Sequence, residues 1–204
     1  MAGRQQHWER IYRNRAADQV GWFQPHAVSS LRLIEEGAGT EASIIDVGGG
    51  ASVLVDDLLD AGYRNLTVLD LAEPALAASR ARLGARAASV QWIAADITRA
   101  ELPAAHYDVW HDRAVFHFLT DPADRARYVA QVLKSVKPGG HVIVATFGPG
   151  GPLQCSGLDV VRYAPDALHA EFGTPFRLLR HETETHLTPA GQAQEFVYCA
   201  CVRT

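Results

Sequence analysis

The chain has 204 residues, of which 48% are hydrophobic and 21% are charged, and it carries a formal net charge of −4. This length and composition fit one globular domain that buries about 70% of its unfolded surface. The acidic balance excludes an overall attraction to nucleic acid, and no apolar run is long enough to span a membrane, so we expect neither partner.

The cysteine content points to a reduced protein. Cys155, Cys199 and Cys201 are too few and too unevenly spaced for a disulfide framework, so we expect a cytoplasmic location. Cys199 and Cys201 lie two residues apart and therefore share one face of a strand, where burial is the expected role. Four arginines near the N-terminus resemble a transit peptide, but Glu9 and Asp18 interrupt them and favour a structural role.

Two helices are predicted before the first strand. Residues 4–14 form an amphipathic helix in which Trp8, Ile11 and Tyr12 occupy one face. A second helix is expected at about 26–37.

An aromatic loop connects these helices. It contains Trp22 and Phe23, which either plug the edge of the core or form a lid over a ligand, with Trp22 facing a cationic group. We therefore divide the chain into an N-terminal segment of helices and lid, residues 1–40, and a main domain, residues 41–204.

The stretch from Ser43 to Ser52 organises the rest of the chain. It is predicted to be a buried strand, a turn of three glycines and the start of a helix. Glycine lets the backbone approach a ligand, and the first turn of a helix offers unpaired N–H groups, so the turn suits a nucleotide-like ligand. Asp46, just before the turn, either contacts this ligand or holds the turn in place.

Two further strands also end in an acid. Leu66–Asp70 follows about twenty residues after the turn, where a carboxylate can accept from both hydroxyls of a ribose, and Val90–Asp96 is the third strand. The acids after these strands, together with Asp46, line up at one edge of a parallel sheet. This is the edge at which open α/β sheets bind ligands.

The later elements continue the alternation of strands and helices. A helix at 73–83, a strand at 107–112, a helix starting at Asp121-Pro122 and a strand at 141–147 are expected. This order predicts a single-domain, doubly wound α/β fold with a mostly parallel sheet and helices on both faces.

The last part of the chain departs from that alternation. The loop at 148–159 is long enough to carry function. Strands at 176–181 and 195–202 are joined by a helix-free link, so they are expected to pair antiparallel.

These motifs resemble the class I S-adenosylmethionine-dependent methyltransferases, whose sheet has seven strands with the last one antiparallel. The family motif acid-x-Gly-x-Gly-x-Gly is matched by Asp46, Gly48 and Gly50, with Ser52 at the third glycine, and Lys137-Pro-Gly-Gly140 is also typical. The resemblance covers roughly residues 40–204. It implies S-adenosylmethionine as the methyl donor.

The same resemblance implies roles for individual residues. Asp70 looks like the ribose-binding acid, and Leu71 like the residue beside adenine. Asp96 and Ile97 look like the pair that recognises the adenine ring and its amino group. A dinucleotide-dependent oxidoreductase is the rival, but its motif requires glycine where this chain has Val53. A non-catalytic binder of the nucleoside is the other alternative.

Candidates for the chemistry lie after the fourth strand and in the long loop. Asp112 is expected to touch the methionine amino group or the substrate, and His117 is a candidate base, although a histidine between two phenylalanines also fits a packed role. Cys155 is expected near the substrate. We predict a small-molecule acceptor, with a thiol or another soft nucleophile favoured and a protein lysine as the alternative. No metal motif is recognised, and the oligomeric state is left open.

Overall fold

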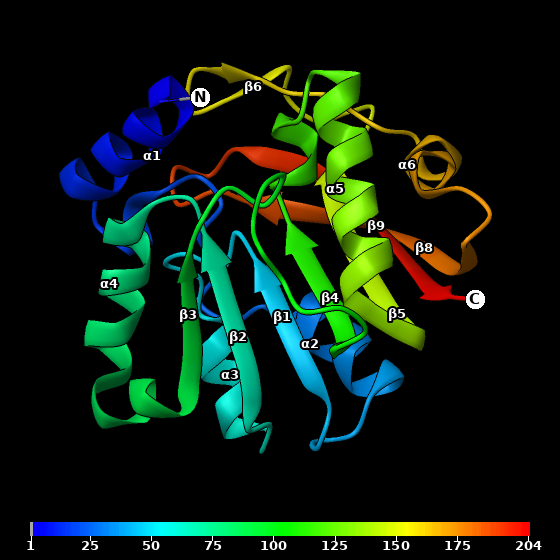
Figure 1. Cartoon of the computed structure of the whole chain (residues 1–204). Helices are drawn as coiled ribbons and strands as arrows, with labels where there is room; N and C mark the ends of the chain where they lie inside the picture. The colour runs from blue at the N-terminus through cyan, green and yellow to red at the C-terminus, as the bar shows by residue number, and fades with distance from the viewer. Residues whose placement is uncertain (1) are drawn as a thin grey trace.

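The computed structural model describes residues 2–204, which form a central seven-stranded sheet in the order β3-β2-β1-β4-β5-β9-β8 (Figure 1). All neighbours from β3 to β5 pair parallel, whereas β9 is antiparallel to both β5 and β8. The predicted mostly parallel sheet with an antiparallel last strand is therefore confirmed. The strands of the sheet are β1 (Ser43–Val47), β2 (Asn65–Asp70), β3 (Val90–Ala94), β4 (Tyr107–Arg113), β5 (Val136–Phe147), β8 (Phe176–Leu187) and β9 (Ala193–Arg203).

Helices cover both faces of the sheet. Figure 1 shows α5 on the near face and α2 and α3 on the far face. The helices are α1 (Ala2–Asn14), α2 (Val28–Gly37), α3 (Leu54–Asp60), α4 (Glu73–Leu83), α5 (Pro122–Ser135) and α6 (Pro165–Phe172), with short 3-10 turns at Ala17–Gln19, Gly84–Ser89 and Phe116–Phe118. None of the helices in residues 2–204 is long and apolar enough to cross a membrane.

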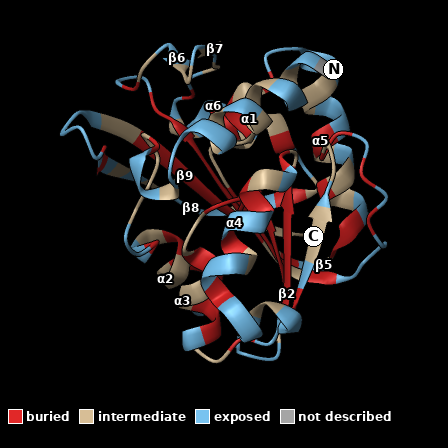
Figure 2. Ribbon diagram, turned by 90° about the vertical axis from the view of Figure 1, so that its left-hand side faces the viewer, coloured by how far each residue is buried: buried red, intermediate tan, exposed pale blue. Residues whose placement is uncertain are grey.

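The core consists of two layers because side chains alternate across each strand. Ile45 belongs to the same hydrophobic cluster as Tyr128 of α5, whereas the adjacent Ile44 belongs to a second cluster with Leu33 of α2. Figure 2 shows the buried strands enclosed by helices whose outer sides are exposed. Residues of α2 share this core with the strands. The predicted division into an N-terminal segment, residues 1–40, and a main domain, residues 41–204, stays a prediction.

Local signals account for the helix ends. The Asp121 carboxylate accepts from the Ala123 N–H at 2.8 Å and caps α5, whose first helical residue is Pro122. Pro74 lies in the first turn of α4, and Gly84 ends that helix at a φ of +58°. These start and stop signals were visible in the sequence, and the structure confirms them.

The C-terminal hairpin is longer than the sequence predicts. β8 stays paired with β9 up to the Leu187–Ala193 pair, so the turn is only 188–192. Residues 182–186 carry charged, hydroxyl and imidazole side chains rather than apolar ones, because β8 is the edge strand of the sheet. The second half of β8 is therefore defined by backbone pairing with β9, and an apolar-polar alternation of side chains does not reveal it in the sequence.

The carboxyl ends of β1 to β4 meet beneath α1 and a small hairpin, β6 (Gln154–Cys155) and β7 (Leu158–Asp159) (Figure 1). The hairpin lies within the long loop that the sequence marked for function. His7 of α1 donates from Nε2 to the carbonyl of Ser156 at 3.0 Å and so joins the helix to the hairpin. These two elements form a roof over the edge of the sheet.

Candidate active site

The glycine turn after β1 contributes Gly48 to the wall of a pocket, whereas Gly50 lies behind it and does not line the pocket. Gly48 has a φ of +73° and Gly50 a φ of +30°, values that disfavour any residue with a side chain. A Cβ atom on Gly48 would lie 2.0 Å from Val115 Cγ2, and one on Gly50 would lie 2.5 Å from Asp70 Oδ2. The turn therefore requires bare backbone, which leaves its peptide groups accessible to a ligand.

Asp70 lies at the end of β2, in the wall of the same pocket. Its Oδ1 accepts from the Ala72 N–H at 2.8 Å, and no described residue donates a hydrogen bond to Oδ2. Burial raises the pKa of Asp70 to about 7, although the hydrogen bond from Ala72 opposes this. A ligand with hydroxyl donors would supply the missing partners.

The other predicted nucleoside-binding residues lie in the wall beyond Asp70. Leu71, Asp96 and Ile97 all line the pocket. Asp96 Oδ1 accepts from the Thr98 N–H at 2.9 Å and from the Thr98 hydroxyl at 2.8 Å, which fixes the carboxylate and leaves Oδ2 for a ligand. The structure therefore brings together the residues that the sequence placed at separate strand ends.

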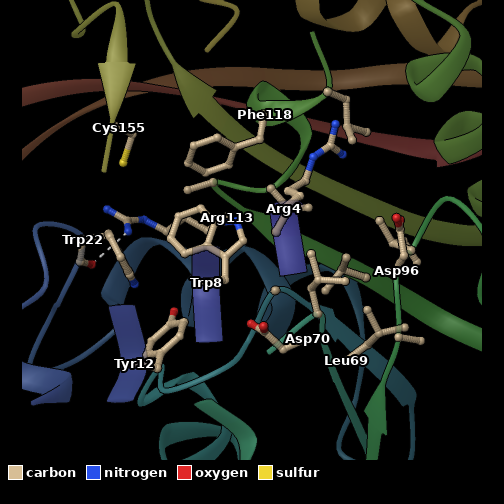
Figure 3. Close-up of a pocket in the computed structure, with 18 residues that line it drawn as sticks. Arg4, Trp8, Tyr12, Trp22, Leu69, Asp70, Asp96, Arg113, Phe118 and Cys155 are labelled. Carbon is tan, nitrogen blue, oxygen red and sulfur yellow. Dashed lines mark hydrogen bonds between the residues drawn. The ribbon is translucent and has the colours of Figure 1, made fainter. Parts of the chain in front are cut away.

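Four aromatic rings, those of Trp8, Tyr12, Trp22 and Phe118, line one side of the pocket (Figure 3). Trp8 lies edge-on to Trp22 at a centroid distance of 5.6 Å and edge-on to Phe118 at 5.0 Å. Tyr12 lies 6.1 Å from Trp22. Trp22 was predicted to lie at this site, whereas Trp8 and Tyr12 were expected only to pack against the domain and Phe118 was not a predicted site residue. The apolar face of the first predicted helix was the available signal.

Arg113 is a pocket residue that sequence analysis missed. Its Nε donates to the Tyr198 hydroxyl at 3.0 Å, Nη2 donates to Glu184 at 3.2 Å and Nη1 donates to the Trp22 carbonyl at 3.3 Å. The guanidinium also lies 4.2 Å from the centroid of the Phe196 ring. Three of its five N–H groups are thus engaged, and the others remain for a ligand.

A second cavity adjoins the first on the α2 side of the glycine turn. It shares Tyr12, Trp22, Gly48 and Arg113 with the first cavity. Its other lining residues include Ser30, Asp46, Gly49, Ser52 and His111. The two cavities together give a long site with one buried carboxylate in each half.

Comparison with known proteins identifies the family. The family described as a methyltransferase domain matches residues 44–140, the segment that contains the glycine turn and all three strand-end acids. Residues 44–140 form a methyltransferase domain, and the chain has the class I methyltransferase fold. Members of this class take their methyl group from S-adenosylmethionine.

The methyltransferase relatives are distant. The mouse eEF1A lysine and N-terminal methyltransferase is 22% identical over 147 residues, which cover 69% of this chain and only 21% of that protein. The chain therefore spans about a fifth of that relative. Nodulation protein S of Rhizobium tropici is 25% identical over 133 residues, which cover 65% of this chain and 53% of that protein.

Solved structures show the same fold. The N-methyltransferase NodS of Bradyrhizobium japonicum, solved with S-adenosylhomocysteine, has a TM-score of 0.72 at 14% identity and covers 96% of this chain and 97% of its own. A protein studied in the conversion of a disulfide bond into a thioacetal group during echinomycin biosynthesis has a TM-score of 0.76 at 15% identity, with coverages of 98% and 92%.

Asp112 lies elsewhere in the methyltransferase than sequence analysis expected. It is completely buried, and its carboxylate accepts from the N–H groups of Val115 (2.8 Å) and Phe116 (3.1 Å) and from the Tyr128 hydroxyl (2.6 Å). Burial raises its pKa to about 7. Asp112 lines neither cavity and instead holds the turn that follows β4, so its expected contact with the cofactor or substrate is corrected.

His117 is also placed away from the site of the methyltransferase. Its ring packs against Phe147 at a centroid distance of 4.6 Å, and its Nδ1 accepts from the Phe147 N–H at 3.3 Å. Burial, together with the positive charge of Arg113, lowers the pKa of His117 to about 3. A histidine that is enclosed and so weakly basic does not reach an acceptor, so its expected role as a base is corrected.

Cys155 lines the first cavity, where sequence analysis placed it. Burial raises the pKa of its thiol to about 11, so the group is uncharged at neutral pH. Among residues 2–204, no cluster of three histidine, cysteine, aspartate or glutamate side chains is arranged to hold a metal ion.

Proposed function

We propose that this protein transfers the methyl group of S-adenosylmethionine to a small-molecule acceptor. One observation carries the proposal: a single pocket joins Gly48 of the glycine turn, the buried and half-satisfied Asp70 carboxylate, and an aromatic roof. S-adenosylmethionine supplies an electrophilic methyl group on a sulfonium. The protein has to hold this group in line with an acceptor and keep water away.

The residues fit the adenosine half of this cofactor. Asp70 Oδ2 would accept from the ribose hydroxyls, and the glycine backbone would lie against the sugar. Asp96 and Ile97 would contact the adenine, and Leu71 would pack beside it. The faces of Trp8 and Trp22 offer negative electrostatic potential to the sulfonium.

The second cavity fits the amino-acid tail of the cofactor. Asp46 supplies a carboxylate for the ammonium group, since its Oδ2 lies beside Gly49 and receives no hydrogen bond from a described residue. Arg113 supplies N–H groups for the carboxylate. Opposite charges on two walls of one cavity match a zwitterion.

The roof over the pocket favours a small acceptor over a protein. In addition to the bond between His7 and the hairpin, Arg4 of α1 pairs with Asp124 of α5 at 3.4 Å. A lysine of a folded protein would need an open channel through this roof. Protein lysine remains the second candidate, because the mouse relative is an eEF1A lysine and N-terminal methyltransferase.

The pocket also favours an acceptor that needs no base. Its two carboxylates, Asp70 and Asp96, are assigned to the cofactor, and the Cys155 thiol is neutral. A thiolate or a metalloid oxyanion loses no proton on methylation, unlike an amine or alcohol. The structural neighbour from echinomycin biosynthesis was studied in the conversion of a disulfide bond into a thioacetal group, which is chemistry at sulfur and agrees with this preference.

A methyl-transfer screen tests the proposal. Wild type and Cys155→Ser, each with labelled S-adenosylmethionine, are incubated with thiols, selenite, tellurite, carboxylic acids, amines and a lysate of the host's proteins. We expect label on a thiol or metalloid acceptor, and a changed KM for that acceptor in Cys155→Ser because this side chain lines the pocket. Label found only in a protein band would reject the small-molecule proposal. Cofactor binding without any transfer would favour the non-catalytic binder.

We also expect the N-terminal roof to be ordered by the cofactor. Hydrogen exchange of peptides covering α1 and Trp22 should slow when S-adenosylhomocysteine is added, because the ligand fills the space beneath these aromatic rings. Peptides from α6, which contributes nothing to the pocket, serve as the control. Equal protection with and without ligand would show that Trp8 and Trp22 are fixed parts of the core.

A further inference from the structure

Three buried side chains form a hydrogen-bonded row along the second cavity. His111 of β4 makes a bond from Nδ1 to Asp46 Oδ1 at 2.7 Å and another between Nε2 and Ser30 Oγ at 2.8 Å. Asp46, His111 and Ser30 are only 4%, 2% and 0% exposed. They come from β1, β4 and α2, so the row depends on the packing of that helix against the sheet.

The row does not form a nucleophilic site. Its residue types and order match those of a Ser-His-Asp triad, in which the serine must reach an acyl carbon. Ser30, however, borders the second cavity without any exposed surface of its own, so it does not reach an acyl carbon. The row therefore has a different use, which follows from the orientation of its histidine.

Because both ring nitrogens of His111 are engaged, the imidazole cannot rotate without breaking a buried hydrogen bond. Its Nδ1 thereby holds Oδ1 of Asp46, and the planar carboxylate places Oδ2 next to Gly49. A Cβ atom on Gly49 would lie 2.3 Å from that oxygen. The free oxygen of Asp46 thus has one fixed position beside the glycine turn.

We infer that His111, supported by Ser30, is a positioning residue for cofactor binding: it fixes Asp46 so that Oδ2 meets the ammonium group of the methionine tail. This inference rests on the proposed function and adds a specific device to it. His111 acts through Asp46 and does not itself hold the ammonium. A carboxylate without this support would rotate, and its contact with the ammonium would weaken.

The test compares two ligands by calorimetry. S-adenosylhomocysteine carries the amino-acid tail, whereas 5′-methylthioadenosine has the same nucleoside and sulfur without it. In His111→Leu, we expect the Kd of S-adenosylhomocysteine to rise about ten-fold and that of methylthioadenosine to stay within about two-fold. His111→Asn keeps an N–H donor near the position of Nδ1 and should retain most of the affinity. Ser30→Ala removes only the hydrogen bond between Ser30 and His111. It should weaken the binding of S-adenosylhomocysteine by a smaller factor and again leave the binding of methylthioadenosine nearly unchanged.

A double-mutant cycle identifies the route of the effect. If His111 acts through Asp46, His111→Leu should cause no further loss in an Asp46→Asn background. Equal weakening of both ligands, or additive losses in the cycle, would overturn the inference. If His111→Leu does not fold, the ligand preference of Ser30→Ala decides the question.

The outcomes also separate this inference from the proposed function. A wild-type protein that binds neither ligand would defeat the proposed function itself. A wild-type protein that binds S-adenosylhomocysteine, with a His111→Leu variant that binds it equally well, would defeat only the role of His111.

Discussion

An Asp70→Ala variant is expected to bind S-adenosylhomocysteine more weakly by about 1–3 kcal/mol, because the ribose hydroxyls would be buried without an acceptor. The carboxylate is 7% exposed and lies in the pocket wall with Oδ2 free of described partners. Calorimetry measures the loss directly. Glu73→Ala is the matched control, since this carboxylate lies three residues further along the chain but is exposed and lines neither cavity.

The pH dependence of binding gives Asp70 a second signature. Burial raises its pKa to about 7 in the ligand-free protein, and ribose hydroxyls donate more strongly to the ionised carboxylate. Affinity should therefore increase between about pH 6 and pH 8, with binding releasing a proton at the lower pH. Asp70→Asn should lack this part of the pH dependence. An unchanged profile, or tight binding of a nicotinamide dinucleotide instead, would contradict the role of Asp70.

The raised pKa of Asp70 has the opposite consequence for the stability of the ligand-free protein, which should fall as pH rises. The unfolded carboxyl group ionises near pH 4 and the folded one near pH 7, so the folded state holds more protons between these values. The contribution of Asp70 to the free energy of unfolding therefore falls as pH rises through this window. It stays unfavourable above about pH 7, where both states are ionised. Added S-adenosylhomocysteine should offset this loss in a thermal melt.

Asp112→Ala is expected to lower the free energy of unfolding by about 3 kcal/mol or more. Two backbone N–H groups and the Tyr128 hydroxyl would each lose a buried acceptor. Because Trp110 Nε1 donates to that hydroxyl at 2.9 Å, the damage should extend into the core. Urea unfolding measures the change.

The control for Asp112 is Asp121→Ala, which removes one backbone acceptor at the exposed N-cap of α5. The Asp121→Ala substitution should lower the free energy of unfolding by about 1 kcal/mol. If Asp112→Ala proves as stable as Asp121→Ala but loses methyl transfer with folding intact, Asp112 would contact the substrate after all. The sequence-based role would then be restored.

Much of the nucleotide-binding edge follows from local signals. The glycine turn requires positive φ at Gly48 and Gly50, and only glycine adopts these values without strain. Asp46, Asp70 and Asp96 lie within two residues of the carboxyl ends of parallel strands, so the topology of the sheet brings them to one edge. These properties depend on neighbouring residues along the chain and on alternation of strands with helices, and both are visible in the sequence.

The side chains after β4 were decided only by the tertiary structure. Both faces of a central parallel strand are buried, so periodicity does not tell which face adjoins the ligand. Asp112 turned into the core, whereas the adjacent Arg113 turned to the cavities. The bond between His7 and Ser156, like that between Asp46 and His111, joins residues more than 60 positions apart. Such contacts exist because packing brings distant segments together, and no local pattern in this sequence specifies them.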